Sequence, residues 1–109
     1  MAARARQRVV KLSAAALDTL SDIWLWNATH YGSAHADGYV RFLEAAFETL
    51  TWAETVGRPV PDRPEYRYLL IKRRAGGHGH VAVFQVDGEQ VTVLRIFHTA
   101  QDWAATLKK

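Results

Sequence analysis

Three histidines in the second half of the chain have the side chain best suited to proton transfer. His78 and His80 flank a glycine in a glycine-rich stretch, and His98 ends an apolar run. Because imidazole is a general acid and base near neutral pH, His98 with His78 or His80 could perform acid–base catalysis. His98 also has two simpler interpretations. It could contact a target molecule, or it could end a strand and bond a neighbouring backbone group or water.

His78 and His80 could also bind a metal ion, but the sequence argues against it. Two histidines without further ligands at suitable spacing make a weak site. The adjacent Gly76-Gly77 is not a phosphate-binding loop, because it lacks the Gly-Lys-Ser/Thr ending and precedes an expected strand. We therefore expect a glycine-rich loop here, with no metal and no cofactor.

Basic residues are concentrated in the second half of the chain. Residues 58–109 hold nine Lys/Arg against five Asp/Glu, whereas residues 1–57 hold five against six. The densest run, Lys72-Arg73-Arg74, is expected at a strand end, where Arg73 points away from its two neighbours. This distribution indicates an acidic partner, such as nucleic acid or an acidic protein surface, with a solvated basic face as the alternative.

Two arginines fall inside expected strands and have two interpretations each. Arg67 and Arg95 could pair with a carboxylate such as that of Asp102, or they could contact the target. Two tryptophans are candidates for burial against another protein. Trp26 lies about 180° around the first expected helix from the middle of its apolar stripe, since each residue advances about 100°. The sheet or the C-terminal tail could cover Trp26 instead, and Trp52 is a weaker case of the same kind.

The elements that position these residues are predicted in the order β-α-α-β-β-β-α. Ser13 caps the first helix and Gly32 ends it. The apolar stripe of that helix is expected at Leu17, Leu20, Trp24, Ala28 and Tyr31. Strands are expected over residues 8–13, 66–74, 81–86 and 90–97, and helices over residues 14–31, 34–54 and 103–107.

The connections between these elements define the fold class. The short link at Gly32 makes the first two helices an antiparallel hairpin. Residues 57–64, with three prolines, predict a turn-rich connection, and Asp87-Gly88 predicts a type I′ turn. We therefore predict an α+β fold, with the helical hairpin packed on a small, mainly antiparallel sheet. The 109 residues are expected to form one domain, with residues 1–7 as a basic arm.

Composition limits the setting in which the chain works. It has no cysteine, so neither a disulfide nor a thiolate metal site is expected. The start of the chain lacks the apolar run of about 7–15 residues that a signal peptide needs, and no stretch reaches the roughly 20 residues of a membrane span. We expect a soluble, cytoplasmic protein that makes no membrane contact.

Several strings, taken in order, resemble the ParE/RelE toxin family over residues 8–107. They are Val10-Lys11-Leu12-Ser13, Ile23-Trp24 with Tyr31-Gly32, Leu43-Glu44-Ala45-Ala46-Phe47, Gly57-Arg58-Pro59, and Val93-Leu94-Arg95-Ile96-Phe97-His98 with Asp102-Trp103. The resemblance implies a bacterial toxin of a type II toxin–antitoxin system, of the kind linked to growth arrest and plasmid stabilisation. It also implies a hetero-oligomer in which a cognate antitoxin wraps and silences the toxin. We expect the antitoxin to cover Trp26 and Trp52.

The resemblance leaves two targets, because RelE-like members cut messenger RNA on the ribosome and ParE-like members act on DNA gyrase. The RelE-like pattern uses strand lysines, a third-strand arginine, and a C-terminal arginine and tyrosine. Lys72, or Arg74, could match one lysine, but the third-strand position falls near Val81. His98 and Thr99 fall where the C-terminal arginine is expected, and no tyrosine follows.

We therefore favour a gyrase-inhibiting toxin that is not an enzyme. One alternative is a ribosome-dependent endoribonuclease centred on His98, and another is a non-toxic homologue that acts as a binding module. No catalytic residue is assigned under the favoured interpretation. The expected target-binding residues are Lys72, Arg73, Arg74, Arg95, His98 and Trp103.

Overall fold

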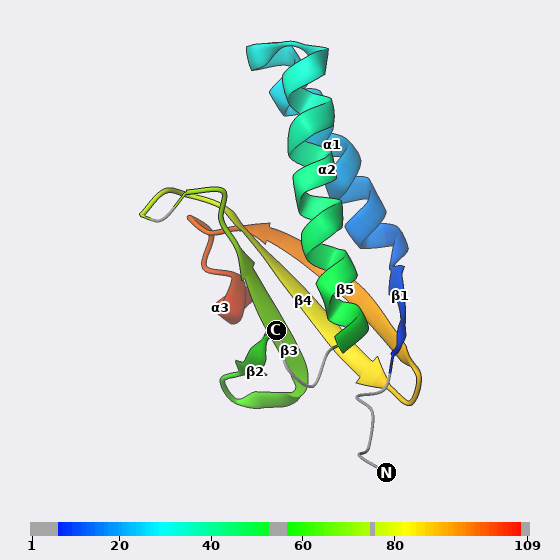
Figure 1. Ribbon diagram of the computed structural model, residues 1–109. Coiled ribbons are helices and arrows are strands. Elements are labelled where there is room, and N and C mark those ends of the chain that lie inside the picture. The colour runs from blue at the N-terminus through cyan, green and yellow to red at the C-terminus, as the bar shows by residue number, and fades with distance from the viewer. Residues whose placement is uncertain (1–6, 53–56, 75, 108–109) are drawn as a thin grey trace.

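The computed structural model describes residues 7–52, 57–74 and 76–107 of the chain (Figure 1). Residues 1–6 of the predicted basic arm lie outside the described residues. The elements are β1 (Val9–Leu12), α1 (Ala14–Tyr31), α2 (Ser33–Glu48), the 3-10 helix η1 (Thr49–Trp52), β2 (Arg58–Val60), β3 (Arg63–Ile71), β4 (His80–Asp87), β5 (Gln90–His98) and α3 (Trp103–Leu107). The predicted α+β architecture is confirmed, with one additional strand, β2. None of the helices in the described part of the chain is long and apolar enough to cross a membrane.

The strands form one sheet in the order β1-β5-β4-β3-β2. β1 runs parallel to β5, and the remaining neighbours pair antiparallel. The sheet is therefore mainly antiparallel, as predicted. The first strand of the chain, β1, and the last, β5, are therefore hydrogen-bonded neighbours in the sheet.

The β2 strand was not predicted, and residues 57–64 are more than a turn-rich connection. β2 pairs with β3, with a register irregularity between Pro59 and Val60. Proline cannot donate to a strand ladder, but it is tolerated on an edge strand, and β2 is an edge of this sheet. Asp62, at a φ of 65°, makes the turn into β3. Pro59 is therefore compatible with a short edge strand and does not exclude one.

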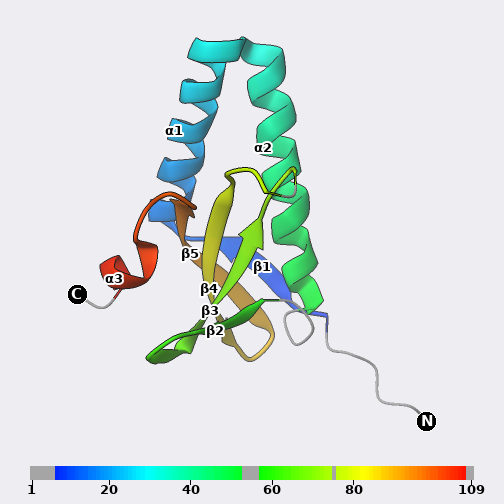
Figure 2. The ribbon, with the colours of Figure 1, turned by 90° about the vertical axis from the view of Figure 1, so that its left-hand side faces the viewer.

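The helical hairpin lies on one face of the sheet, and its turn extends well beyond the strand ends (Figure 2). The Oγ atom of Ser13 accepts a hydrogen bond from the N–H of Ala16 at 3.0 Å, which caps α1 as predicted. The same hydroxyl donates to the carbonyl of Leu94 at 2.7 Å. Gly32, at a φ of 94°, forms the turn between the helices. Ser13 therefore both starts α1 and fixes it to β5.

The core-facing side of α1 is one position out of phase with the predicted stripe. Ala16 and Asn27 are buried, whereas Leu17 and Tyr31, both expected inside, are 52% and 61% exposed. The bonds of Ser13 bring the first turn of α1 close to β5, where the small side chain of Ala16 fits. The buried stripe therefore runs through residues 16, 20, 23 and 27.

The second helix is shorter than predicted. Its core face, continued into the residues that follow it, carries the buried side chains of Ala36, Leu43, Phe47 and Leu50. However, α2 ends at Glu48 and tightens into η1, as the last turn of a helix often does. The hydroxyl of Thr49 donates to the carbonyl of Ala46 at 2.6 Å at this point. Residues 53 and 54 of the predicted helix lie outside the described residues.

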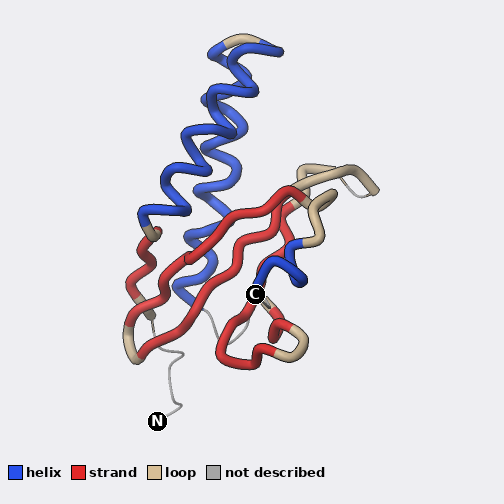
Figure 3. Tube along the Cα trace, turned by 180° about the vertical axis from the view of Figure 1, so that it is seen from behind, coloured by secondary structure: helices blue, strands red, loops and turns tan. Residues whose placement is uncertain are grey.

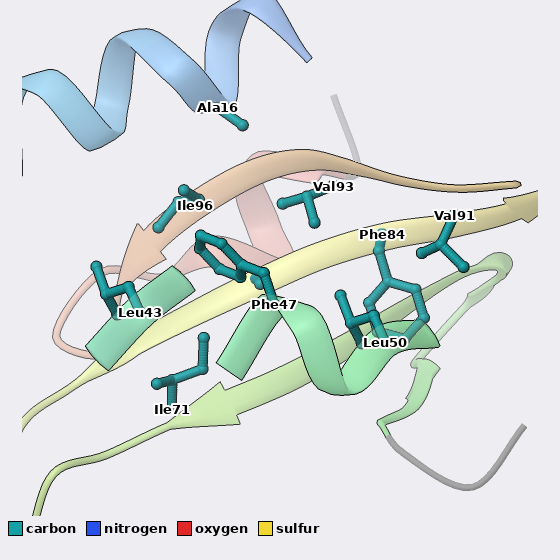
Figure 4. Packing of buried hydrophobic residues seen from close by; sticks show 10 residues of the cluster. Ala16, Leu43, Phe47, Leu50, Ile71, Phe84, Val91, Val93 and Ile96 are labelled. Carbon is teal, nitrogen blue, oxygen red and sulfur yellow. The ribbon is translucent and has the colours of Figure 1, made fainter. Parts of the chain in front are cut away.

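Two apolar clusters lie on opposite faces of the sheet. The larger packs the hairpin and η1 on the sheet and contains Ala16, Leu43, Phe47, Leu50, Ile71, Ala82, Phe84, Val91, Val93 and Ile96 (Figure 4). The smaller contains Val60, Val81, Val83 and Phe97, packed against Tyr66, Tyr68, Trp103 and Leu107. The short α3 therefore covers the face opposite the hairpin (Figure 3).

Two local predictions need correction. The predicted strand over residues 66–74 lies at Arg63–Ile71, so Lys72, Arg73 and Arg74 belong to the loop after β3. The β4–β5 turn is not type I′, which requires a positive φ at both central residues. Only Gly88 has one, at 59°, while Glu89 does not. Glycine at the first central position is the pattern of a type II′ turn.

Candidate functional site

A pocket of about 660 Å³ opens between the helical hairpin and the end of the sheet. It unites residues that the sequence analysis treated separately, namely Trp26 and the three histidines. Its lining consists of Ile23, Trp26, Asn27 and Tyr31 from α1, Tyr39 from α2, His78 from the β3–β4 loop, His80 from β4 and His98 from β5. The pocket is the candidate site because it combines aromatic walls with several polar groups.

Strand pairing places the histidines next to one another. His80 and His98 are cross-strand partners in β4 and β5, with ring centroids 5.3 Å apart. The ring of His78 lies 5.6 Å from that of His98. Beside them, the N–H of Gly79 donates to Oγ1 of Thr99 at 3.0 Å, and the N–H of Thr99 donates to the Gly79 carbonyl at 3.0 Å. These two bonds hold the histidine-bearing loop against the end of β5.

Gly79 is required by the close approach of the backbone. It is buried, and a Cβ atom at this position would collide with the carbonyl oxygen of Ile71. A larger residue would therefore push the loop away from β3 and separate His78 from His98. The glycine between the two histidines, which the sequence suggested only as a loop signal, is a packing requirement of the site.

His80 is held in its neutral form by its surroundings. Burial first, and the charge of His98 second, lower the pKa of His80 to about 4. Burial raises the pKa of Tyr39, against an opposing effect of Arg73, so that side chain keeps its proton. The hydroxyl of Tyr39 lies 2.6 Å from Nδ1 of His80. When this hydroxyl donates to Nδ1, the proton of the His80 ring lies on Nε2.

His98 is exposed, and its ring is already engaged by the backbone. The N–H of Ala100 donates to Nδ1 of His98 at 3.1 Å, and the N–H of His98 donates to Oε1 of Gln101 at 2.8 Å. In the neutral ring the proton is therefore on Nε2, which can donate but has no lone pair with which to accept a proton. This geometry weakens the catalytic interpretation of His98 and agrees with a strand-end ring that bonds a neighbouring backbone group.

Asn27 is a functional candidate that the sequence analysis missed. It is only 8% exposed, and its Nδ2 donates to the carbonyl of Ile23 at 2.8 Å. A buried amide is unfavourable unless its polar atoms are bonded, and its place on the pocket wall leaves its oxygen available to a ligand. The signal was the helical spacing from Ala16, which places position 27 on the core side. In the described part of the chain, no group of three or more His, Cys, Asp or Glu side chains is arranged to hold a metal ion.

The basic run lies beside the pocket but does not line it. Lys72, Arg73 and Arg74 are all exposed in the loop after β3. The guanidinium of Arg73 lies over the ring of Phe42 at 5.6 Å, which places it against α2. Among the described residues, Lys72 and Arg74 make no comparable contact with α2.

Arg67 and Arg95 do not form the ion pair that the sequence suggested. Nη2 of Arg67 donates to the carbonyl of Gly57 at 3.1 Å. The guanidinium of Arg95 lies over the ring of Phe97 at 4.9 Å, on the face of the sheet that carries the smaller cluster. In the described structure the carboxylate of Asp102 instead accepts from the N–H of Ala105 at 3.4 Å.

The three tryptophans that the sequence suggested as contact residues, Trp26, Trp52 and Trp103, lie in different places. Trp26 is 53% exposed and stacks on His30, with centroids 4.0 Å apart, so the sheet and α3 leave much of it uncovered. Trp52, in η1, is 42% exposed and lies at the end of the hairpin away from its turn. Trp103 packs on Tyr68 at 4.9 Å. Only Trp26 of the three lines the pocket.

Comparison with known proteins shows to which family the chain belongs. The family described as "ParE toxin of type II toxin-antitoxin system, parDE" matches residues 10–103. The chain belongs to the ParE toxin family. It is 31% identical over 97 residues to Toxin ParE1 of Caulobacter vibrioides, covering 89% of this chain and 95% of that one. The matched segment of this ParE-family toxin contains every residue that lines the pocket.

A solved structure supports the ParE fold independently. The structure described as "Chromosomal ParDE TA system from P. aeruginosa" superimposes with a TM-score of 0.72. The sequence identity is 23%, and the match covers 85% of this chain and 97% of that chain. The fold of this ParE-family toxin is therefore that of the ParE/RelE class, as the sequence predicted.

Proposed function

We propose that this ParE-family toxin inhibits DNA gyrase in the cytoplasm and is neutralised by a cognate antitoxin. The observation that carries the proposal is the family match over residues 10–103. The ParE-like branch of the resemblance acts on gyrase, and inhibition of an enzyme by binding needs no bond-making groups in the toxin. The hydrogen bond that occupies Nδ1 of His98 supports this mode of action over RNA cleavage.

The antitoxin surface is proposed at the pocket and the adjoining face of α1. Leu25, Trp26 and Tyr31 are 60%, 53% and 61% exposed there. Partly exposed aromatic side chains around a concavity are typical of protein–protein contact sites. A chain of the antitoxin that fills the pocket would bury Trp26 and would form the hetero-oligomer that the resemblance implies. Trp52, at the other end of the hairpin, fits this surface only if the antitoxin wraps along the whole hairpin.

The gyrase-binding surface is proposed at the basic loop and the neighbouring strand end. The side chains of Lys72 and Arg74 are exposed and, within the described residues, make no hydrogen bond or ion pair. Arg95 is exposed on the face opposite the hairpin. Trp103 packs on the same face, so α3 would support that surface rather than insert into the target.

Expression in bacterial cells tests the toxin–antitoxin part of the proposal. The chain alone should arrest growth, and co-expression of the antitoxin encoded beside it should restore growth, which is the behaviour that stabilises plasmids. Retained growth with a folded, soluble chain would contradict the proposal and favour a non-toxic binding module. Growth arrest with cleavage of messenger RNA at ribosomes would favour the endoribonuclease instead.

A further inference from the structure

We propose that the pocket recognises a carboxylate carried by an apolar segment of the partner protein, and that His98 and His78 donate hydrogen bonds to this carboxylate. The identification of that partner as the antitoxin rests on the proposed function, whereas the chemistry of the pocket does not. The three histidines differ in burial and in the hydrogen bonds that their ring nitrogens already make. We assign their roles from these differences.

His80 positions His98 and does not itself bind the carboxylate. It is partly buried, and its Nδ1 is held by the hydroxyl of Tyr39 at 2.6 Å. The low pKa of this ring, about 4, keeps it uncharged at neutral pH. His80 therefore fixes the floor of the pocket, and through strand pairing it fixes the place of His98.

His98 has a hydrogen-bond donor at a fixed ring position, Nε2. Because the N–H of Ala100 bonds Nδ1, the neutral ring presents N–H at Nε2. This ring lines the pocket and is exposed, so the donor is accessible to a ligand. A carboxylate accepts such a bond and has no proton to give in return, which matches a ring that cannot accept one.

His78 has an exposed ring that makes no hydrogen bond in the described structure. It lies in the loop before β4, with its ring 5.6 Å from that of His98. Because a neutral imidazole carries one N–H, His78 can donate a second hydrogen bond to a carboxylate that is bonded to His98.

The charges around the pocket favour an anionic ligand. No Asp or Glu is among the residues that line it, which all belong to the described part of the chain. The titratable groups that face His78 across the pocket are Tyr31 from α1, Tyr39 from α2, His80 from β4 and His98 from β5. Arg73, against α2, acts on Tyr39 from beside the pocket. A carboxylate would enter without like-charge repulsion.

The remaining walls indicate that the ligand is a protein segment and not a simple anion. Ile23, Trp26 and Tyr31 provide an apolar and aromatic side, and the nearly buried Asn27 offers an amide oxygen. Such a set suits an apolar side chain, a backbone N–H and a neighbouring carboxylate. An Asp or Glu next to an aromatic or aliphatic residue of a partner chain supplies these groups together.

The test uses two matched probes and the full, isotope-labelled chain. Indole-3-acetate carries an aromatic ring and a carboxylate, and indole-3-acetamide is its uncharged counterpart. Each is titrated into the protein at about pH 7, and binding is followed through the NMR signals of the pocket residues. We expect the carboxylate to bind about three- to fivefold more tightly than the amide, which is the range of exposed contacts to a charged group.

Variants assign the preference to the histidines. His78→Gln and His98→Gln should each reduce the preference for the carboxylate over the amide. His35→Gln, which removes an exposed imidazole that does not line the pocket, should leave the preference unchanged. Equal binding of acid and amide, binding of neither, or a preference that survives both substitutions would overturn the proposal. None of these readouts depends on toxicity or gyrase, so the outcome is separate from that of the proposed function.

Discussion

The hydroxyl of Tyr39 lies 2.6 Å from Nδ1 of His80, and this contact joins the helical hairpin to the sheet across the pocket. The two rings also pack at an angle, with centroids 5.5 Å apart. Tyr39 belongs to α2 and His80 to the first position of β4. The pair therefore sets how far the upper part of the hairpin stands from the end of the sheet, and with it the width of the pocket.

Tyr39→Phe should destabilise the fold by about 1 kcal/mol, because it removes one hydrogen bond and leaves Nδ1 of His80 without its partner. Urea unfolding followed by circular dichroism measures the change. Tyr31→Phe is the control, since Tyr31 is 61% exposed and its contacts within the described part of the chain are between rings. If the two variants lose equal stability, the Tyr39–His80 contact does not hold the hairpin to the sheet.

His80 should make the stability of the protein depend on pH in a specific window. Its pKa is about 4 in the folded state, against 6.5 for an ordinary histidine, so the unfolded chain takes up the proton first as the pH falls. The free energy of unfolding should therefore fall from about pH 6.5 down to about pH 4, while above this window His80 has no effect. His80→Gln, which still offers Tyr39 an acceptor, should reduce that slope.

Urea unfolding at a series of pH values measures the slope for His80→Gln and for His35→Gln. The second variant removes an exposed histidine outside the pocket and should keep the slope of the unaltered protein. An unchanged slope in His80→Gln would show that another group is responsible for the acid sensitivity.

Gly79→Ala should destabilise the protein by about 1–3 kcal/mol, as expected for overpacking, because its Cβ would collide with the Ile71 carbonyl oxygen. Thermal unfolding measures this loss. Gly77→Ala is the matched control in the same loop, since a Cβ there would lie 3.5 Å from the Arg74 carbonyl oxygen, an ordinary contact. Comparable melting temperatures for the two variants would refute the close approach at Gly79.

Trp26→Ala should mainly weaken antitoxin binding, whereas Trp103→Ala should mainly reduce the stability of the fold. Trp26 is 53% exposed, so its loss should change stability by less than about 1 kcal/mol but weaken antitoxin binding about tenfold or more. Trp103 packs on Tyr68, so its loss should destabilise by about 1–2 kcal/mol and affect antitoxin binding less. Calorimetric titration with the antitoxin and chemical unfolding measure the two quantities. Equal losses of stability and binding in Trp26→Ala would place that residue in the core instead.

The fold was largely predictable from local signals, because caps, turns and periodicity act over a few residues. Ser13 and Gly32 bounded α1 correctly, and the short link at Gly32 gave the helical hairpin. The β2 strand was missed because Pro59 excludes a central strand but not an edge strand, and edge position is a property of the whole sheet. The phase of α1 was missed because Ala16 is buried by close packing on β5, although Leu17 is the more apolar residue.

The site was predictable only in its parts. The sequence singled out His78, His80, His98 and Trp26 individually. Their position in one pocket depends on the pairing of β4 with β5 and on the extension of the helical hairpin beyond the strand ends. Nothing in the sequence gives the Tyr39–His80 contact, which joins residues 41 positions apart. Of the two interpretations given for Arg67 and Arg95, the structure shows no pairing with Asp102 among the described residues, because Arg67 bonds the carbonyl of Gly57 and Arg95 lies over the ring of Phe97.

A DNA gyrase supercoiling assay with the purified chain, in the absence of antitoxin, tests whether the chain inhibits gyrase. We expect that supercoiling is inhibited as the chain is added, that cleaved DNA accumulates, and that the antitoxin reverses the effect. Replacing Lys72 and Arg74 with alanine should weaken inhibition, while His98→Gln should retain it. Full gyrase activity in the presence of a large excess of folded chain would contradict the account and direct attention to ribosomes and His98.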